Sequence, residues 1–130
     1  MQRMWIALAL AGCPSDPPPE CITVDSTCQP LYPPTFQNVY DQTLKDGCGS
    51  ERSACHSRIG HKGGMTFEDP DTAYQALMTN DRVVPGDAAC SEMIVRTNSP
   101  GADYQMPPGA ALSDAEQCAL VQWVHAGAPR

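Results

Sequence analysis

Residues 48–56 read Cys-Gly-Ser-Glu-Arg-Ser-Ala-Cys-His, and the prediction of the fold starts from this stretch. It places two cysteines and a histidine in a segment that has no hydrophobic period. The same segment continues to residue 66 and contains the Gly63-Gly64 pair, so we predict a loop. Thiols and an imidazole are ligating or reactive groups, and the loop therefore carries the candidate chemistry of this chain.

A helix is predicted immediately before this loop. Its apolar face follows the three- and four-residue spacing of an α-helix. The face comprises Phe36, Val39, Tyr40, Thr43 and Leu44. Two prolines precede the helix, and Gly47 is suited to its C-terminal cap. The loop is thus expected to begin where a helix ends.

Two shorter helices are predicted after the loop. Asp69-Pro70 is an N-cap followed by a proline at the first helical position, and the helix should continue to Met78. Residues 89–96 predict another short helix. Residues 97–112 are irregular and are centred on Gln105-Met106-Pro107-Pro108-Gly109.

The last predicted helix has the clearest signals. Ser113 and Glu116 form a capping box at its start, and Gly127 ends it. No segment shows the strict alternation that indicates a strand. We therefore predict an all-α fold over residues 35–130, with three to four short helices, long loops and disulfide staples.

These parts, taken in order, resemble the small c-type cytochrome domains of bacterial exported proteins. The resemblance covers about residues 35–129. It rests on four motifs in this order: Cys48 to Cys55-His56, Gly63-Gly64, Met106-Pro107-Pro108-Gly109, and Trp123-Val124-His125-Ala126-Gly127-Ala128. It implies a cytochrome c-like domain that carries electrons with one haem c. Electron transfer of this kind needs no enzymatic activity.

The resemblance also implies a role for each candidate residue. Cys48 and Cys55 match the two haem-linking cysteines, His56 the proximal axial ligand, and Met106 the distal axial ligand. The family motif has two residues between its cysteines, whereas this sequence has six. A His nitrogen with a Met sulfur is a natural axial pair for an electron-transfer haem.

The composition excludes some classes of protein. The 130 residues carry 15 acidic and 8 basic side chains, which gives a formal net charge of -7, and no basic cluster is present. A nucleic-acid binder is therefore not expected, whereas a basic redox partner would suit the acidic surface. Aromatic residues make up only 6% of the chain. A domain with so little apolar bulk needs a staple or a cofactor.

The N-terminus predicts export and lipidation. Leu10-Ala11-Gly12-Cys13 resembles a bacterial lipobox, in which the cysteine is lipidated and the leader is removed before it. We expect residues 1–12 to be a lipoprotein signal peptide. Lipid on Cys13 would anchor an extracytoplasmic domain to a bacterial membrane. The apolar run after Arg3 is too short to span a membrane by itself.

Residues 13–34 contain seven prolines and are expected to form a tether. The extracytoplasmic compartment permits disulfides. We expect Cys21 to pair with Cys28 inside the tether, and Cys90 to pair with Cys118 in the domain, although six cysteines allow 15 pairings.

Two alternatives remain for the 48–56 segment. A Cys48–Cys55 disulfide would leave a haem-free, disulfide-stapled lipoprotein domain with a structural or binding role. Zinc is a third possibility, with Cys48, Cys55, His56 and His61 as ligands, although the gap between the cysteines is wider than in common zinc sites. Otherwise His61 and His125 are expected to be exposed.

Overall fold

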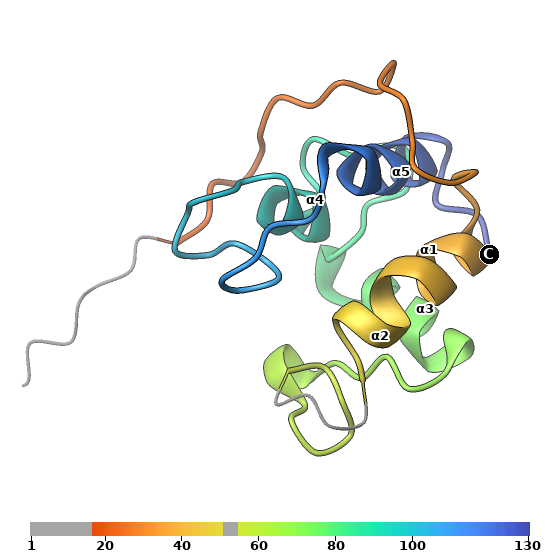
Figure 1. Cartoon of the computed structure of the whole chain (residues 1–130), viewed down its shortest axis with the longest axis vertical. Helices are drawn as coiled ribbons and strands as arrows, with labels where there is room; N and C mark the ends of the chain where they lie inside the picture. The colour runs from red at the N-terminus through yellow and green to blue at the C-terminus, as the bar shows by residue number, and fades with distance from the viewer. Residues whose placement is uncertain (1–16, 51–54) are drawn as a thin grey trace, which may run out of the picture.

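A computed structural model describes residues 17–50 and 55–130 of the chain. Helices and loops make up these residues, and within them the only β pairing is an isolated bridge between Val84 and Asp87. The all-α fold predicted from the sequence is confirmed (Figure 1). The elements are α1 Phe36–Val39, a π-helical turn Tyr40–Leu44, α2 Lys45–Gly47, a 3-10 turn Lys62–Gly64, α3 Pro70–Met78, a 3-10 turn Thr79–Asp81, α4 Glu92–Thr97 and α5 Asp114–His125.

The first helical segment runs from α1 through the π-helical turn into α2. Thr35 caps it, since its side-chain oxygen accepts a hydrogen bond from the backbone N–H of Asn38 at 3.3 Å. All five residues of the predicted apolar face are buried. The π-helical turn lies in the middle of this face, where the spacing alone predicts a regular α-helix.

Local hydrogen bonds precede α3 and α4, and a side-chain cap sets the start of α3. The carboxylate of Asp69 accepts from the backbone N–H of Thr72 at 2.9 Å, as expected for the N-cap of α3. Helix α4 begins at Glu92 and not at residue 89, because residues before it form a turn. In that turn the N–H of Cys90 donates to a carboxylate oxygen of Asp87 at 3.1 Å.

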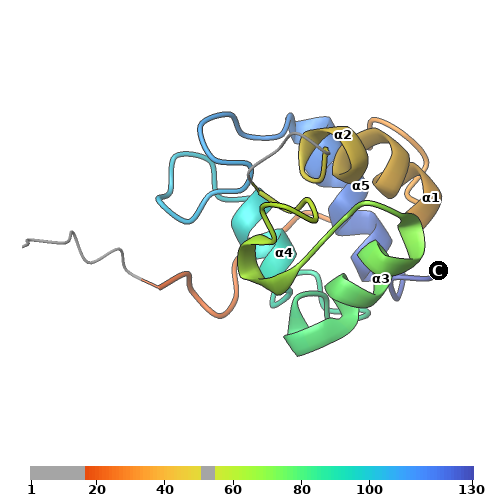
Figure 2. The same ribbon diagram turned by 90° about the horizontal axis from the view of Figure 1, so that it is seen from below.

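Helix α5 lies beside α1 and α4 and carries much of the core (Figure 2). The predicted capping box is present: the backbone N–H of Glu116 donates to the Ser113 hydroxyl, and the backbone N–H of Ser113 donates to the Glu116 carboxylate. The ring of Trp123 is fully buried and lies 5.4 Å from that of Phe36. Despite the low aromatic content, a continuous apolar core therefore joins the first and last helices.

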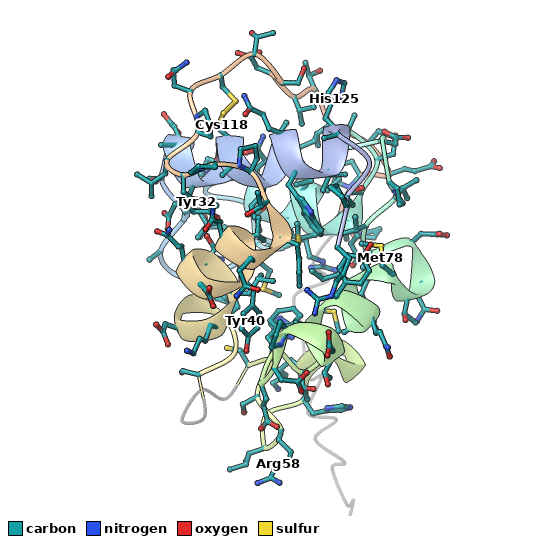
Figure 3. All side chains as sticks on the ribbon, turned by 90° about the vertical axis from the view of Figure 1, so that its right-hand side faces the viewer. Tyr32, Tyr40, Arg58, Met78, Cys118 and His125 are labelled. Atoms are coloured by element: carbon teal, nitrogen blue, oxygen red, sulfur yellow. A yellow bond between two sulfur atoms is a disulfide. The ribbon has the colours of Figure 1, made fainter. Side chains whose placement is uncertain are left out.

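The disulfide pairing expected from sequence position is wrong. The structure pairs Cys21 with Cys90 and Cys28 with Cys118, although the same four cysteines form the two bridges. Residues 17–34 run along α4 and α5, which places each of the early cysteines beside a late one (Figures 1 and 3). Their separations of 69 and 90 residues could not be inferred from local spacing.

Residues 17–34 are consequently part of the domain and not a loose tether, and we call them the N-terminal strap. Besides the two disulfides, the side-chain amide of Gln122 on α5 donates to the carbonyls of Ser26 and Cys28. Tyr32 is buried at the end of the strap, and its hydroxyl lies 2.5 Å from that of Thr43. The boundary expected at residue 34 therefore does not separate two independent parts.

The predicted leader and the predicted lipidation site at Cys13 lie outside the described residues. Among the helices that the structure does describe, none has the length and apolar character needed to cross a membrane.

Candidate functional site

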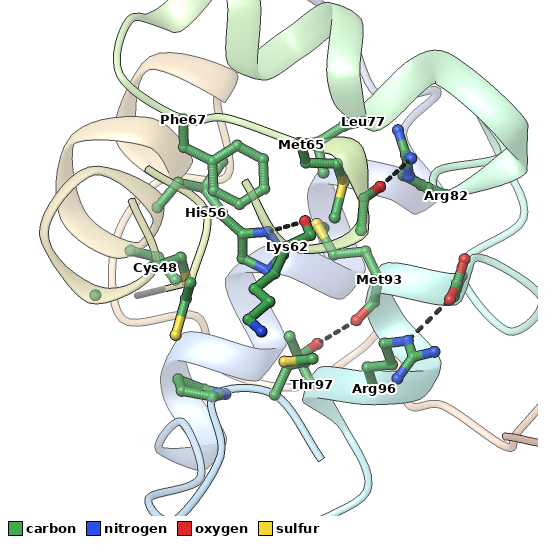
Figure 4. A pocket seen from close by; sticks show the side chains of 18 of the residues that line it. Cys48, His56, Lys62, Met65, Phe67, Leu77, Arg82, Met93, Arg96 and Thr97 are labelled. Atoms are coloured by element: carbon green, nitrogen blue, oxygen red, sulfur yellow. Dashed lines mark hydrogen bonds and ion pairs between the residues drawn. The ribbon is translucent and has the colours of Figure 1, made fainter. Parts of the chain in front are cut away.

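A cavity of about 450 Å³ lies between the first helical segment, the 55–67 loop, α4 and the 106–108 loop (Figure 4). Its walls are mostly apolar, and its size falls within the range of small-molecule and cofactor sites. All four candidate residues line it: Cys48, Cys55, His56 and Met106. The fold thus brings together side chains that span almost 60 positions of sequence.

The two ends of the 48–56 segment meet in space. The backbone N–H of His56 donates to the carbonyl of Cys48 at 3.2 Å, so the two ends of the segment lie side by side. The carbonyl of His56 in turn accepts from the N–H of Phe67 at 2.9 Å. Cys48 and Cys55 both carry thiols, and neither takes part in the two disulfides. Their expected convergence on one site is therefore present.

The imidazole of His56 is oriented by a main-chain hydrogen bond. The residue is only 9% exposed, and its ring centroid lies 5.0 Å from that of Phe67. Nδ1 lies 2.9 Å from the carbonyl oxygen of Lys62 (Figure 4). A carbonyl oxygen can only accept, so Nδ1 carries the proton and the lone pair of the neutral ring is on Nε2. This is the arrangement found behind metal-ligating histidines.

The surroundings also keep His56 neutral. Burial is the main reason that the pKa of His56 lies below its ordinary value, and the positive charges of Arg82 and Arg96 lower it further. The hydrogen bond to Lys62 acts in the opposite direction but does not outweigh burial. A neutral imidazole at physiological pH is the form that binds a metal.

The thiol of Cys48 is kept protonated. Burial raises the pKa of Cys48 to about 11, and the nearby Cys55 and Glu116 raise it further by charge repulsion. The thiolate is the form that attacks disulfides and reacts with oxidants. Cys48 is therefore held as an unreactive thiol at neutral pH.

Met106 is placed by its backbone on the side of the cavity formed by α4. Its N–H donates to the carbonyl of Arg96 at 2.9 Å, and the side-chain amide of Gln105 donates to the carbonyl of Pro107 at 2.8 Å. Met106 is half-buried. The irregular 97–112 loop is thus fixed at the point where the candidate sulfur ligand occurs.

Five further residues of the site were not identified from the sequence: the thioethers of Met65 and Met93, and the cations Lys62, Arg82 and Arg96. The basic residues belong to no cluster in the sequence, and only the fold gathers them around one cavity. They place three positive charges beside one carboxylate, that of Glu92, among the described residues of the cavity wall, within a chain of net charge -7.

The zinc alternative finds no support in the geometry. Residues 17–50 and 55–130 contain no group of three or more Cys, His, Asp or Glu side chains placed to hold a metal ion. His61 is exposed, as is His125 near the end of α5 (Figure 3). The expectation that both histidines face solvent is confirmed.

Comparison with known proteins gives one match. No curated protein and no solved structure is significantly similar to this chain. A family model described as planctomycete cytochrome C matches residues 53–109, which include Cys55, His56 and Met106 but not Cys48. The matched segment contains the 55–67 loop, α4 and the 106–108 loop, which form most of the cavity wall. The match therefore supports a cytochrome c-like domain in this chain.

Proposed function

We propose that this protein is an extracytoplasmic electron carrier that binds one haem c. Cys48 and Cys55 would link the haem, and His56 and Met106 would be its axial ligands. The observation that carries the proposal is the presence of all four side chains in the wall of one mostly apolar cavity. The family match to the segment containing three of them supports it.

The donor set fits haem iron. The neutral imidazole of His56 offers Nε2, because Nδ1 donates to the Lys62 carbonyl, and Met106 offers a soft sulfur. Haem, when bound, supplies a one-electron iron couple, and a His/Met pair favours the reduced iron. The apolar walls of the cavity exclude water and preserve this preference.

The wide gap between the cysteines is compatible with covalent attachment. Attachment would add the S–H of Cys48 and of Cys55 across one vinyl C=C each, giving a thioether with the hydrogen on the neighbouring carbon. The backbone hydrogen bond between His56 and Cys48 brings the first cysteine back beside the histidine. Both thiols line the same cavity, so each is available to one bound group.

The proposal also covers where the protein is located and which kind of redox partner it meets. Lipid on Cys13 would hold the domain at a bacterial membrane, outside the cytoplasm. The two disulfides are consistent with an oxidising compartment. The net charge of -7 favours transient docking with a redox protein that presents a basic face. Electron transfer alone makes no bond in a substrate, so we propose no enzymatic activity.

The absorbance spectrum of the purified, reduced protein tests the cofactor. We expect the sharp visible bands of a low-spin haem, which persist in the protein after extraction with acidified acetone. Extraction of the haem would refute the covalent links to Cys48 and Cys55. It would not contradict the assignment of His56 and Met106 as iron ligands. A protein expressed with haem-attachment machinery that shows no haem band would refute the proposal and favour a haem-free binding domain.

Substitution of Met106 tests the sulfur ligand. Met106→Ala should abolish the weak long-wavelength band of a thioether-ligated ferric haem and lower the midpoint potential, because the ligand that favours ferrous iron is lost. Met65→Ala and Met93→Ala are matched controls, since both thioethers line the same cavity. If either control removes the band and Met106→Ala does not, Met106 is not the ligand.

A further inference from the structure

Arg82 connects two parts of the cavity wall. Its guanidinium donates through one nitrogen to the carbonyl of Ala76 in α3 at 2.8 Å, and through the other to the carbonyl of Gly63 at 2.7 Å. Among the described residues no carboxylate pairs with Arg82, whereas Arg96 on the same wall binds Glu92 at 2.8 Å. The Arg82 guanidinium thus donates to main-chain oxygens of two separate elements.

The Gly63 carbonyl belongs to the turn that orients His56. This turn has left-handed backbone at His61, Gly63 and Gly64, with φ values of 44°, 64° and 69°. Glycine adopts such a conformation freely, but at His61 it is sparsely populated and depends on contacts with the surroundings. Its Lys62 carbonyl accepts the proton of His56 Nδ1. Movement of the turn would therefore weaken the hydrogen bond to the imidazole.

We infer that Arg82 is a positioning residue for His56, acting through the 62–64 turn by bonding the Gly63 carbonyl next to the carbonyl that holds Nδ1. Arg82 ties this turn to the end of α3 and so fixes both the orientation of the imidazole and the nitrogen that carries its proton. The inference deepens the proposed function, because His56 is the iron ligand assigned there. The hydrogen bonds themselves belong to the chain and are testable with or without haem.

Arg96 provides the matched comparison. Both arginines line the cavity, and the charge of each lowers the pKa of His56. Only Arg82 is seen to bond the 62–64 turn, since Arg96 bonds Glu92 and lies 3.5 Å from the carbonyl of Tyr104. Lysine at either position keeps the charge but loses the two-pronged geometry. A difference between Arg82→Lys and Arg96→Lys therefore reports positioning and not charge.

The experiment follows the His56 Nδ1 proton by NMR in the full exported chain labelled with ¹⁵N-histidine. A haem-bearing sample is first reduced, because low-spin ferrous iron is diamagnetic and the His56 proton then stays observable. In a haem-free sample the ¹⁵N shifts of His56 also report which ring nitrogen carries the proton. Arg82→Lys should speed solvent exchange of this proton by about tenfold or more, as expected for loss of a charge-assisted hydrogen bond. Arg96→Lys should change the rate by less than about twofold.

Three outcomes would overturn the inference. The first is an exchange rate in Arg82→Lys equal to that of the parent protein. The second is an equal acceleration by Arg96→Lys. The third needs no variant and so does not depend on folding of a substituted chain: guanidinium resonances of Arg82 that show free rotation in the parent protein. The absorbance spectrum, recorded on the same samples, reports separately whether haem is bound.

Discussion

Gly49 shows how a single missing side chain permits the site to form. A Cβ at this position would lie 2.6 Å from the Cβ of Phe67 and 3.1 Å from its carbonyl oxygen. These neighbours are close to the main chain and cannot move aside by a rotamer change. The Phe67 ring packs against that of His56 in a tilted arrangement, and the Phe67 N–H donates to the His56 carbonyl. The close approach at Gly49 therefore joins the end of the first helical segment to the imidazole.

We predict that Gly49→Ala lowers the free energy of unfolding by about 1–3 kcal/mol, because overpacking forces the two backbones apart. Denaturant unfolding of the variant measures this loss. Gly47→Ala is the control two residues away, since no atom lies within 4 Å of the added Cβ. It should be neutral or stabilising by up to about 1 kcal/mol, because alanine is the better helix former. Equal losses in both variants would contradict the role of close approach.

The raised pKa of Cys48 predicts slow alkylation of its thiol. With a pKa of about 11, the reactive thiolate fraction at neutral pH is very small and increases about tenfold for each pH unit below that value. Protein made without haem-attachment machinery should show this dependence in its rate of reaction with iodoacetamide. In Cys55→Ser, the midpoint should move to lower pH, because a like charge is removed. A Cys48 rate that levels off near pH 8 would contradict the effect of burial.

At the scale of the helix, the N-cap of α3 predicts an acid-dependent stability. The pKa of Asp69 lies below its ordinary value of 3.8, mainly because its carboxylate accepts the backbone N–H of Thr72. The folded chain then binds fewer protons than the unfolded chain in acid. The stabilisation is therefore complete above about pH 4 and is lost as the pH falls through the folded pKa.

Asp69→Asn separates the charge from the cap. Asparagine is also a good N-cap, but it does not titrate. The stability advantage of the parent protein over Asp69→Asn should therefore shrink between about pH 6 and about pH 3, as measured by thermal unfolding. A constant difference across this range would show that the carboxylate charge does not contribute. Because Asp69 is fully exposed, the effect should be small and should decrease with added salt.

The helix starts could be predicted because their signals are local. The partners of Asp69 and Ser113 lie three residues away in the same turn, so the spacing alone identifies them. The order of motifs singled out His56 and Met106, and the structure places both in the wall of one cavity. Arg82 could not be predicted, because its acceptors are main-chain carbonyls, which have no sequence signature. The π-helical turn could not be predicted for a related reason. The spacing of apolar residues does not distinguish the backbone hydrogen bonds of a π-helix from those of an α-helix.

At the scale of the whole molecule, the N-terminal strap adds covalent cross-links to a domain whose apolar core contains few aromatic residues. Its disulfides, Cys21–Cys90 and Cys28–Cys118, hold α4 and α5 from outside, while Leu120 of α5 reaches the cavity wall. Their pairing was beyond local reasoning, because it depends on how the strap crosses the two helices. A domain with few aromatic residues is thus stapled on one side, and on the other side it retains a cavity suited to a cofactor.

The length of the closed loops predicts how much each staple contributes. Separations of 69 and 90 residues each correspond to about 4–5 kcal/mol of loop entropy removed from the unfolded chain. Replacing both cysteines of either pair by serine should therefore reduce the free energy of unfolding by a similar amount, up to about 4 kcal/mol, in denaturant titrations. That is a large share of the stability of a small domain. If either double variant stays within about 1 kcal/mol of the parent, the strap is not what closes this fold, and the stability must come from the core around Trp123.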